Sequence, residues 1–219
     1  MRGIAIIGGE SPAPEFIKKI ACGADILVAA DSGLMAAEAA GLEPDWIIGD
    51  MDSLDDLKRL DKYPRERILR FPAEKDRTDT ELALALLGEK GCNEIWISGG
   101  GGGRADHLYA ILSLFEGENS PGLPVPDRWY PGNGEIFCLR ERGLLREDLR
   151  PGGMVSVFPL GKGPWEAKSS GLKWPLDKLA WVKGGLGLSN IASNGKFEIQ
   201  SISGRFLVII PGESWRWRQ

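Results

Sequence analysis

The sequence contains a single histidine, His107, and only three cysteines, Cys22, Cys92 and Cys138, which lie far apart. One histidine excludes zinc sites built from several histidines and leaves only one possible centre for a Ser-His-Asp triad. The cysteines are odd in number, and their spacing fits no metal site. We therefore interpret them as buried thiols of a protein in a reducing compartment, and we expect a cytoplasmic protein.

Long apolar runs and a strong net charge are also lacking. The sequence has no run of about 18 apolar residues, which is the length needed to cross a membrane. The start, MRGIAIIGGE, is typical of a strand rather than of a signal peptide. The formal net charge of the 219 residues is only -4. A mildly acidic chain has no general attraction for nucleic acid or for anionic lipid. We expect neither partner, so local groups would have to hold any phosphate ligand.

The first half of the chain alternates short apolar runs with helical patterns. Runs such as GIAIIGG (3–9) and ADILVAAD (24–31) predict buried strands, and TDTELALALLGEKG (78–91) predicts a helix. Alternation of this kind favours a mostly parallel sheet with helices on its faces. We predict a Rossmann-like α/β domain over residues 1–120.

The pattern changes in the segment GENSPGLPVPDRWYPGNG (117–134), which is dense in proline and glycine. We interpret residues 121–134 as a linker. Beyond it the chain has short β-prone runs separated by glycines and prolines: EIFCLR (135–140), MVSVFPL (154–160), FEIQSIS (197–203) and RFLVIIP (205–211). These runs predict an all-β sandwich or barrel domain over residues 135–219.

Aspartates follow four successive predicted strands of the first domain: Asp31, Asp50, Asp52, Asp76, Asp79 and Asp106. Ligands of open α/β sheets bind outside the carboxyl ends of the strands, so these side chains should share one edge. Two carboxylates about 4 Å apart repel by about 1 kcal/mol in water, and by more where water is partly excluded. Mg²⁺ takes oxygen ligands and shares them with phosphates, so a bound cation would explain the arrangement.

Simpler interpretations exist for the single members of this set. Aspartate often caps a helix start, and Thr78 with Glu81 forms a capping box, T-x-x-E. Asp31 before Ser-Gly could be an ordinary turn residue. The recurrence at four strand ends favours the metal site, because independent capping would not require it.

The run SGGGGGRADH (98–107) lies between a predicted strand and a predicted helix. Its glycines would let the backbone approach an anion at the helix N-terminus, although a flexible hinge is the alternative. The run is neither a P-loop nor the dinucleotide-binding fingerprint. Arg104 within it, and Lys75 in AEKDRTD, could pair with phosphate oxygens. His107 could act as a base, but a histidine at a helix start is more often structural.

Four segments taken together resemble the thiamine pyrophosphokinase family, also called thiamine diphosphokinase. They are ADSG (30–33), GDMDS (49–53), KDRTDTE (75–81) and GGRADH (102–107). In the second half, SGLKWPL (170–176) and GLSN (187–190) resemble the thiamine-site segments of that family. The resemblance extends from about residue 4 to residue 211. One departure is ADSG, where many relatives have a double glycine.

This resemblance implies a Mg²⁺-dependent reaction of ATP with thiamine that gives AMP and thiamine diphosphate, in a homodimer. By motif, the catalytic acids would be Asp31, Asp50, Asp52, Asp79 and Asp106, of which Asp50, Asp52 and Asp79 would hold the metal. ATP would contact Lys75, Thr78, Gly102, Gly103 and Arg104. Thiamine would contact Trp174, Ser189 and Asn190 from the partner subunit. A thiazolium cation beside a tryptophan ring is a favourable pair.

Two other functions stay open at this point. A Mg²⁺-dependent phosphohydrolase, or another nucleotidyl-handling enzyme on a similar scaffold, would use the acids but would not need the segments around Trp174 and Asn190. A non-catalytic thiamine sensor would be expected to lose its acids, whereas the set here is complete.

Overall fold

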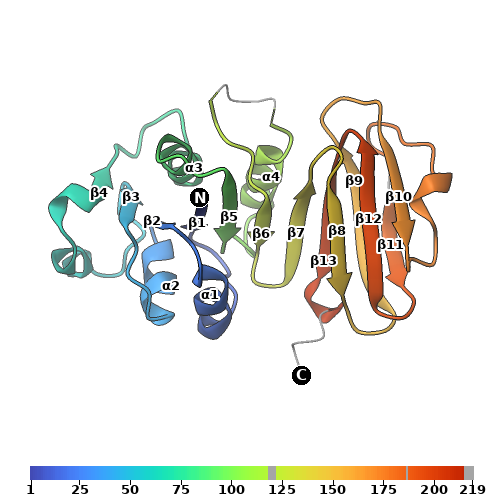
Figure 1. The fold of residues 1–219 in the computed structure, drawn as a ribbon. Coiled ribbons are helices and arrows are strands. Elements are labelled where there is room, and N and C mark those ends of the chain that lie inside the picture. Colours follow the sequence, from blue (N-terminus) through green and yellow to red (C-terminus); the bar gives the residue numbers. More distant parts are fainter. Residues whose placement is uncertain (118–121, 186, 215–219) are drawn as a thin grey trace. The chain divides into compact units, whose positions relative to one another are not determined.

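The computed structural model describes residues 1–117, 122–185 and 187–214 (Figure 1). The chain divides into two compact units, Met1–Gly132 and the residues from Asn133 onward. None of the described helices is both long and apolar enough to span a membrane.

The first unit contains a parallel sheet with the strand order β6-β5-β1-β2-β3-β4. Its strands are β1 (Arg2–Ile6), β2 (Ile26–Ala30), β3 (Trp46–Gly49), β4 (Ile68–Arg70), β5 (Glu94–Ser98) and β6 (Arg128–Tyr130). In β1, β2 and β5 every residue after the first is buried. A strand covered on both faces needs a continuous apolar run, which is why these strands could be predicted from the sequence.

Helices cover both faces of this sheet. They are α1 (Pro14–Ala21), α2 (Gly33–Ala39), α3 (Asp79–Glu89) and α4 (Ala105–Leu114). In Figure 1, α1 and α2 lie on one face and α3 and α4 lie on the other. Two 3₁₀ turns, η1 (Leu57–Lys62) and η2 (Arg65–Arg67), connect β3 to β4. This arrangement confirms the predicted α/β class.

The strand order changes direction beside β1. From β1 the chain builds outward through β2 and β3 to β4, and α3 then returns it to β5 on the other side of β1. Connections from β1 and β5 therefore diverge at their carboxyl ends, where open α/β sheets bind ligands. Glycines follow both strands at this point, Gly8 and Gly9 after β1 and Gly99–Gly103 after β5.

The segment interpreted as a linker, 121–134, contains a strand of the first sheet. Residues Arg128–Tyr130 form β6 and pair in parallel with β5, and Trp129 is only 1% exposed. This three-residue strand could not be predicted from the composition because prolines and glycines flank it. The division between the compact units falls between Gly132 and Asn133 in the chain, within the segment expected to be a linker. The boundary expected between residues 120 and 121 lies outside the described residues.

The second unit consists of two antiparallel sheets, with strand orders β11-β9-β13-β7 and β10-β12-β8. Its strands are β7 (Gly134–Leu139), β8 (Leu144–Asp148), β9 (Gly153–Leu160), β10 (Glu166–Ser170), β11 (Gly187–Ala192), β12 (Lys196–Ser203) and β13 (Arg205–Pro211), with 3₁₀ turns η3 (Leu176–Lys178) and η4 (Gly212–Ser214). In β12, Phe197, Ile199 and Ser201 are buried and alternate with more exposed residues. This alternation is typical of a sandwich and confirms the predicted all-β class.

Replacing Gly33 by alanine should destabilise the first unit. An added Cβ would lie 2.1 Å from the carbonyl oxygen of Ile6, which is backbone and cannot turn away. Overpacking of this kind costs about 3 kcal/mol, which outweighs the gain of about 1 kcal/mol from the better helix propensity of alanine. Urea unfolding followed by circular dichroism measures the difference.

Gly41→Ala, just beyond the other end of α2, is the matched control. Gly41 has a φ of +67°, and an added Cβ there would meet nothing within 4 Å. Only left-handed strain of about 1 kcal/mol is then expected. Equal losses for the two variants would contradict the close approach of α2 to β1.

Candidate active site

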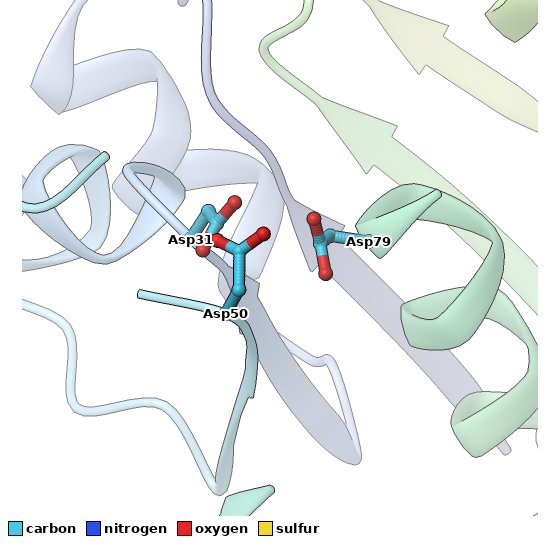
Figure 2. A group of neighbouring side chains, drawn as sticks. All are labelled: Asp31, Asp50 and Asp79. Carbon is cyan, nitrogen blue, oxygen red and sulfur yellow. The ribbon is translucent and has the colours of Figure 1, made fainter. Parts of the chain in front are cut away.

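Three carboxylates from separate segments meet at the carboxyl edge of the first sheet. Asp31 follows β2, Asp50 follows β3, and Asp79 begins α3. Each offers an oxygen atom, and these oxygens all lie within 4.8 Å of one another. Figure 2 shows the three side chains pointing toward a common space. We call Asp31, Asp50 and Asp79 the carboxylate group.

The backbone at the end of β3 permits this close approach. Gly49 has a φ of +142°, and a Cβ placed on it would lie 2.4 Å from Oδ1 of Asp31 and 3.3 Å from Oδ1 of Asp79. Oδ1 of Asp31 also accepts a hydrogen bond from the backbone N–H of Met51 at 3.0 Å. Asp31 itself has a left-handed backbone, with a φ of +49°. Position 49 therefore needs glycine for space as well as for its conformation.

Met51 separates the two aspartates of the D-x-D motif by turning into the core. Its side chain is 2% exposed, and it packs in a cluster with Ala29, Leu34, Ile47, Leu54, Leu60 and Tyr63. Its φ of +68° takes the chain out of the extended conformation. Asp50 therefore lies partly buried in the carboxylate group, while Asp52 lies on an exposed turn.

The expected metal ligands were Asp50, Asp52 and Asp79, whereas the carboxylate group contains Asp31 and not Asp52. The sequence had placed Asp31 among the catalytic acids but not among the metal ligands. Metal binding by Asp52 stays a prediction. Asp76 is exposed and also lies outside the group.

A second set of charged residues, which the sequence analysis missed, fastens the segment after Met51 onto α2. Glu38 of α2 accepts hydrogen bonds from Arg59, from Lys62 at 3.3 Å and from the hydroxyl of Tyr63 at 3.4 Å. Arg59 also donates to both carboxylate oxygens of Asp55, at 2.6 and 2.8 Å. Only the i, i+4 pair Asp55–Arg59 has a sequence signal, because Glu38 lies more than 20 residues earlier.

Lys75 lies against the carboxylate group. Its Nζ is 3.4 Å from Oδ2 of Asp50 and 3.1 Å from Oδ1 of Asp79. Burial alone would lower the pKa of Lys75, but the contacts with Asp79 and Asp50 outweigh it and raise that pKa. Oδ1 of Asp79 is buried and accepts no hydrogen bond of normal geometry from the described residues. This oxygen therefore already lies against one cationic group, the Lys75 ammonium at 3.1 Å.

Thr78 caps α3, as the sequence predicted. Its hydroxyl accepts the backbone N–H of Glu81 at 3.2 Å, and the Glu81 carboxylate accepts the backbone N–H of Thr78 at 2.8 Å. This capping box fixes the first turn of α3 and so directs Asp79 toward Asp31 and Asp50. The predicted contact of Thr78 with ATP is untested, although Thr78 lines the cavity described next.

A cavity of about 890 Å³ opens beside the carboxylate group, within the first unit. One wall is made of glycines from the loops after β1 and β5, and another is made of apolar residues, chiefly Ile111 and Leu114 of α4 and Leu123. Asp31, Thr78, Asp79, Arg104 and His107 also line it, as do the expected ATP contacts Gly102 and Gly103. The cavity thus combines backbone N–H groups, charge and an apolar surface.

The two glycine loops are fastened to each other by Glu10. Its backbone N–H donates to the carbonyl of Gly101 at 2.8 Å, and the N–H of Gly101 donates back at 3.0 Å. A Cβ at Gly101 would lie 1.7 Å from the carbonyl oxygen of Pro131, and one at Gly102 would lie 2.3 Å from the Glu10 carboxyl carbon. Much of the glycine run is therefore required for packing, which argues against the flexible hinge considered from sequence.

Asp106 lies apart from the carboxylate group. It is exposed and receives two hydrogen bonds from Arg104, at 2.6 and 3.1 Å, which lower its pKa to about 2. His107 is exposed at the start of α4. Of the four strand ends predicted to share one site, β2, β3 and β4 are each followed by one acid of the group, and the acid after β5 pairs with an arginine. A catalytic role for Asp106 stays a prediction.

The expected thiamine contacts lie in the second unit. Asn190 is 4% exposed, and its side chain forms hydrogen bonds with backbone groups. Its Oδ1 accepts from the N–H groups of Trp174 and Ile191, at 3.1 and 2.8 Å, and its Nδ2 donates to the carbonyl of Trp174 at 2.6 Å. Asn190 therefore positions Trp174, whose side chain is 50% exposed. Ser189 has a φ of +56°, and its N–H donates to the hydroxyl of Ser156 at 3.0 Å.

Comparison with known proteins gives two matches to family models. The model described as the catalytic domain of thiamin pyrophosphokinase matches residues 17–124. The model described as the vitamin B1 binding domain of thiamin pyrophosphokinase matches residues 144–205. The chain belongs to the thiamin pyrophosphokinase family. The resemblance seen in the sequence motifs is thereby confirmed.

Relatives of the thiamin pyrophosphokinase family are similar over most of the chain. The thiamine pyrophosphokinase of Bacillus subtilis (strain 168) is 28% identical over an alignment of 176 residues that covers 78% of this chain and 80% of that one. A crystal structure of the B. subtilis enzyme has a TM-score of 0.75 at 22% identity and covers 95% of this chain and 98% of its own. A family protein from Enterococcus faecalis has a TM-score of 0.73 at 25% identity, covering 96% and 99%.

The pKa of Asp31 predicts how the stability of the metal-free protein depends on pH. Burial first, and then the charges of Asp79 and Asp50, raise this pKa to about 6. Between about pH 4 and pH 6 the folded state binds more protons than the unfolded state, so stability falls as the pH rises through this window. In EDTA, Asp31→Asn should therefore be more stable than the natural protein at pH 8, by about 1 kcal/mol because the carboxylate is partly hydrated.

Urea unfolding at pH 4 and pH 8 measures this effect. At pH 4 the two proteins should be equally stable, because Asp31 is then protonated in the folded state. Asp61→Asn, in the exposed part of η1, is the control for the loss of one charge. The same stability difference at both pH values would contradict a raised pKa at Asp31.

Proposed function

We propose that this protein transfers the diphosphate group of ATP to the hydroxyl of thiamine, giving thiamine diphosphate and AMP, in a reaction that needs Mg²⁺. The observation that carries the proposal is the carboxylate group beside a glycine-lined cavity, in a chain that matches both domains of the thiamin pyrophosphokinase family. By the same resemblance we propose a cytoplasmic homodimer.

The residues of the carboxylate group fit Mg²⁺. Mg²⁺ prefers hard oxygen ligands and commonly binds through one or two carboxylates together with substrate phosphates. Asp31, Asp50 and Asp79 offer three such oxygens within 4.8 Å of one another, and the buried Oδ1 of Asp79 already lies 3.1 Å from a cationic group, the Lys75 ammonium. We therefore infer that these three would hold the ion. When bound, Mg²⁺ would offset charge on the phosphate oxygens.

The chain's own residues would position the triphosphate for displacement. Backbone N–H groups of the glycine loops, with Arg104 and Lys75, would bind phosphate oxygens, and the apolar wall at Ile111 and Leu114 would bind the base. The thiamine hydroxyl oxygen forms a bond to the β-phosphorus while the bond from that phosphorus to the oxygen of AMP breaks. Catalysis of this kind comes mainly from positioning and from neutralisation of charge.

Asp52 is the better candidate for accepting the hydroxyl proton. The other candidate is Asp79, which lies in the carboxylate group and against Lys75. Asp52 lies outside the group, and the neighbouring Asp50 carboxylate raises its pKa. A proton acceptor benefits from a raised pKa.

Trp174 would bind the thiazolium ring of thiamine. Half of its side chain is exposed, and a cation already lies on the ring, because Nζ of Lys173 is 4.6 Å from the ring centroid. An aromatic face attracts cations, and the attraction increases when water is excluded. Asn190 would act through the backbone of Trp174, and Ser189 stays a proposed direct contact.

The test is an assay with Mg²⁺, ATP and thiamine in which AMP, ADP and phosphate are separated and quantified. We expect AMP and thiamine diphosphate in equal amounts, and no AMP in EDTA. Asp50→Asn should reduce the rate by at least about 100-fold, because a charged ligand of the transferring phosphates is lost. Asp61→Asn, an exposed aspartate of η1, should keep the normal rate.

The other functions give different products. Release of phosphate or ADP that does not depend on thiamine would favour the phosphohydrolase. Thiamine binding without AMP formation under any divalent metal would favour the sensor.

A further inference from the structure

Lys75 occupies the position of a counter-ion within the carboxylate group. Its side chain is only 13% exposed, and its ammonium contacts Asp50 at 3.4 Å and Asp79 at 3.1 Å. It lies in the segment between β4 and α3, four residues before Asp79. An ammonium of the same chain thus compensates two of the three carboxylates proposed to bind Mg²⁺.

A divalent cation and this ammonium compete for the same oxygens. Mg²⁺ bound to Asp50 and Asp79 would lie about 2 Å from their oxygens, close to the place where the ammonium now lies. The repulsion between two cations at this range is several times stronger in a partly dehydrated site than in bulk water. Lys75 should therefore weaken the binding of a free divalent cation.

A triphosphate reverses the sign of this effect. Fully ionised ATP brings about four negative charges, which is enough to compensate both cations together. Lysine has a flexible four-carbon stem with three donors, so its ammonium can move from the carboxylates to a phosphate oxygen. The cavity that would hold the phosphates is lined by Asp79 and by Thr78, close in sequence to Lys75. With the triphosphate bound, Lys75 should strengthen binding of the metal complex.

We propose that Lys75 determines which form of the metal enters the site: it acts as an internal counter-ion that excludes the free divalent cation and admits the cation together with a nucleoside triphosphate. The inference rests on the proposed metal site. By this inference Lys75 weakens the binding of the free divalent cation and strengthens the binding of the cation–triphosphate complex. A residue that only bound phosphate, or only held α3 in place, would not have these two opposite effects.

The test is a titration with Mn²⁺ in which the free ion is measured by electron paramagnetic resonance. Without nucleotide, Lys75→Met should bind Mn²⁺ about 10-fold more tightly than the natural protein, and Lys75→Arg should bind it like the natural protein. With α,β-methylene ATP present, which cannot release AMP, the order should reverse, so that Lys75→Met binds the Mn²⁺ complex more weakly. Lys58→Met, an exposed lysine of η1, is the control for the loss of one charge and should stay within about twofold in both titrations.

Two results would overturn the inference. One is an Mn²⁺ affinity of Lys75→Met that is equal to or weaker than that of the natural protein without nucleotide. The other is a gain that survives when Asp50→Asn is added to Lys75→Met, because the ion would then be bound elsewhere. If the affinities reverse as expected but the natural protein forms no AMP from ATP and thiamine, the inference is supported and only the proposed reaction fails.

Discussion

Repulsion among carboxylates is the constraint on which the first unit depends. Asp31, Asp50 and Asp79 come from three segments and bring oxygens within 4.8 Å of one another, where burial and then the charges of Asp79 and Asp50 raise the pKa of Asp31. Such an arrangement persists only if other parts of the fold hold it or a cation compensates it. The structure supplies both: a rigid surround for each acid, and Lys75 between two of them.

The surround combines uncharged packing with a helix cap and one ion pair. Gly49 leaves room for Asp31 and Asp79, Met51 fastens the chain into the core between Asp50 and Asp52, and the capping box at Thr78 sets the first turn of α3. Glu38 then ties the following segment to α2 through Arg59. These contacts hold the backbone segments that carry the acids, and the carboxylates themselves are contacted by Lys75 and by the backbone N–H of Met51.

The sequence predicted what depends on local pattern and failed where distant contacts decide. Continuous apolar runs predicted β1, β2 and β5, and T-x-x-E predicted the start of α3. The strand β6 was not predicted because only three residues, flanked by prolines, form it. The strand β10, with the sequence EAKSS, was not predicted because only Ala167 of its residues is buried. The spacing of the D-x-D motif does not predict the left-handed backbone at Met51, which leaves Asp52 outside the carboxylate group. The ion pair of Arg59 with Glu38 could not be predicted, because the two residues are 21 positions apart in the sequence.

The central claim is that one divalent cation joins these three acids beside a bound nucleotide. Anomalous diffraction from a crystal grown with Mn²⁺ and α,β-methylene ATP tests it most directly. We predict an anomalous peak about 2 Å from carboxylate oxygens of Asp31, Asp50 and Asp79, which is the distance that such small cations adopt with oxygen. A fully bound nucleotide with no peak in that position, or with the ion held only by other residues, would contradict the account.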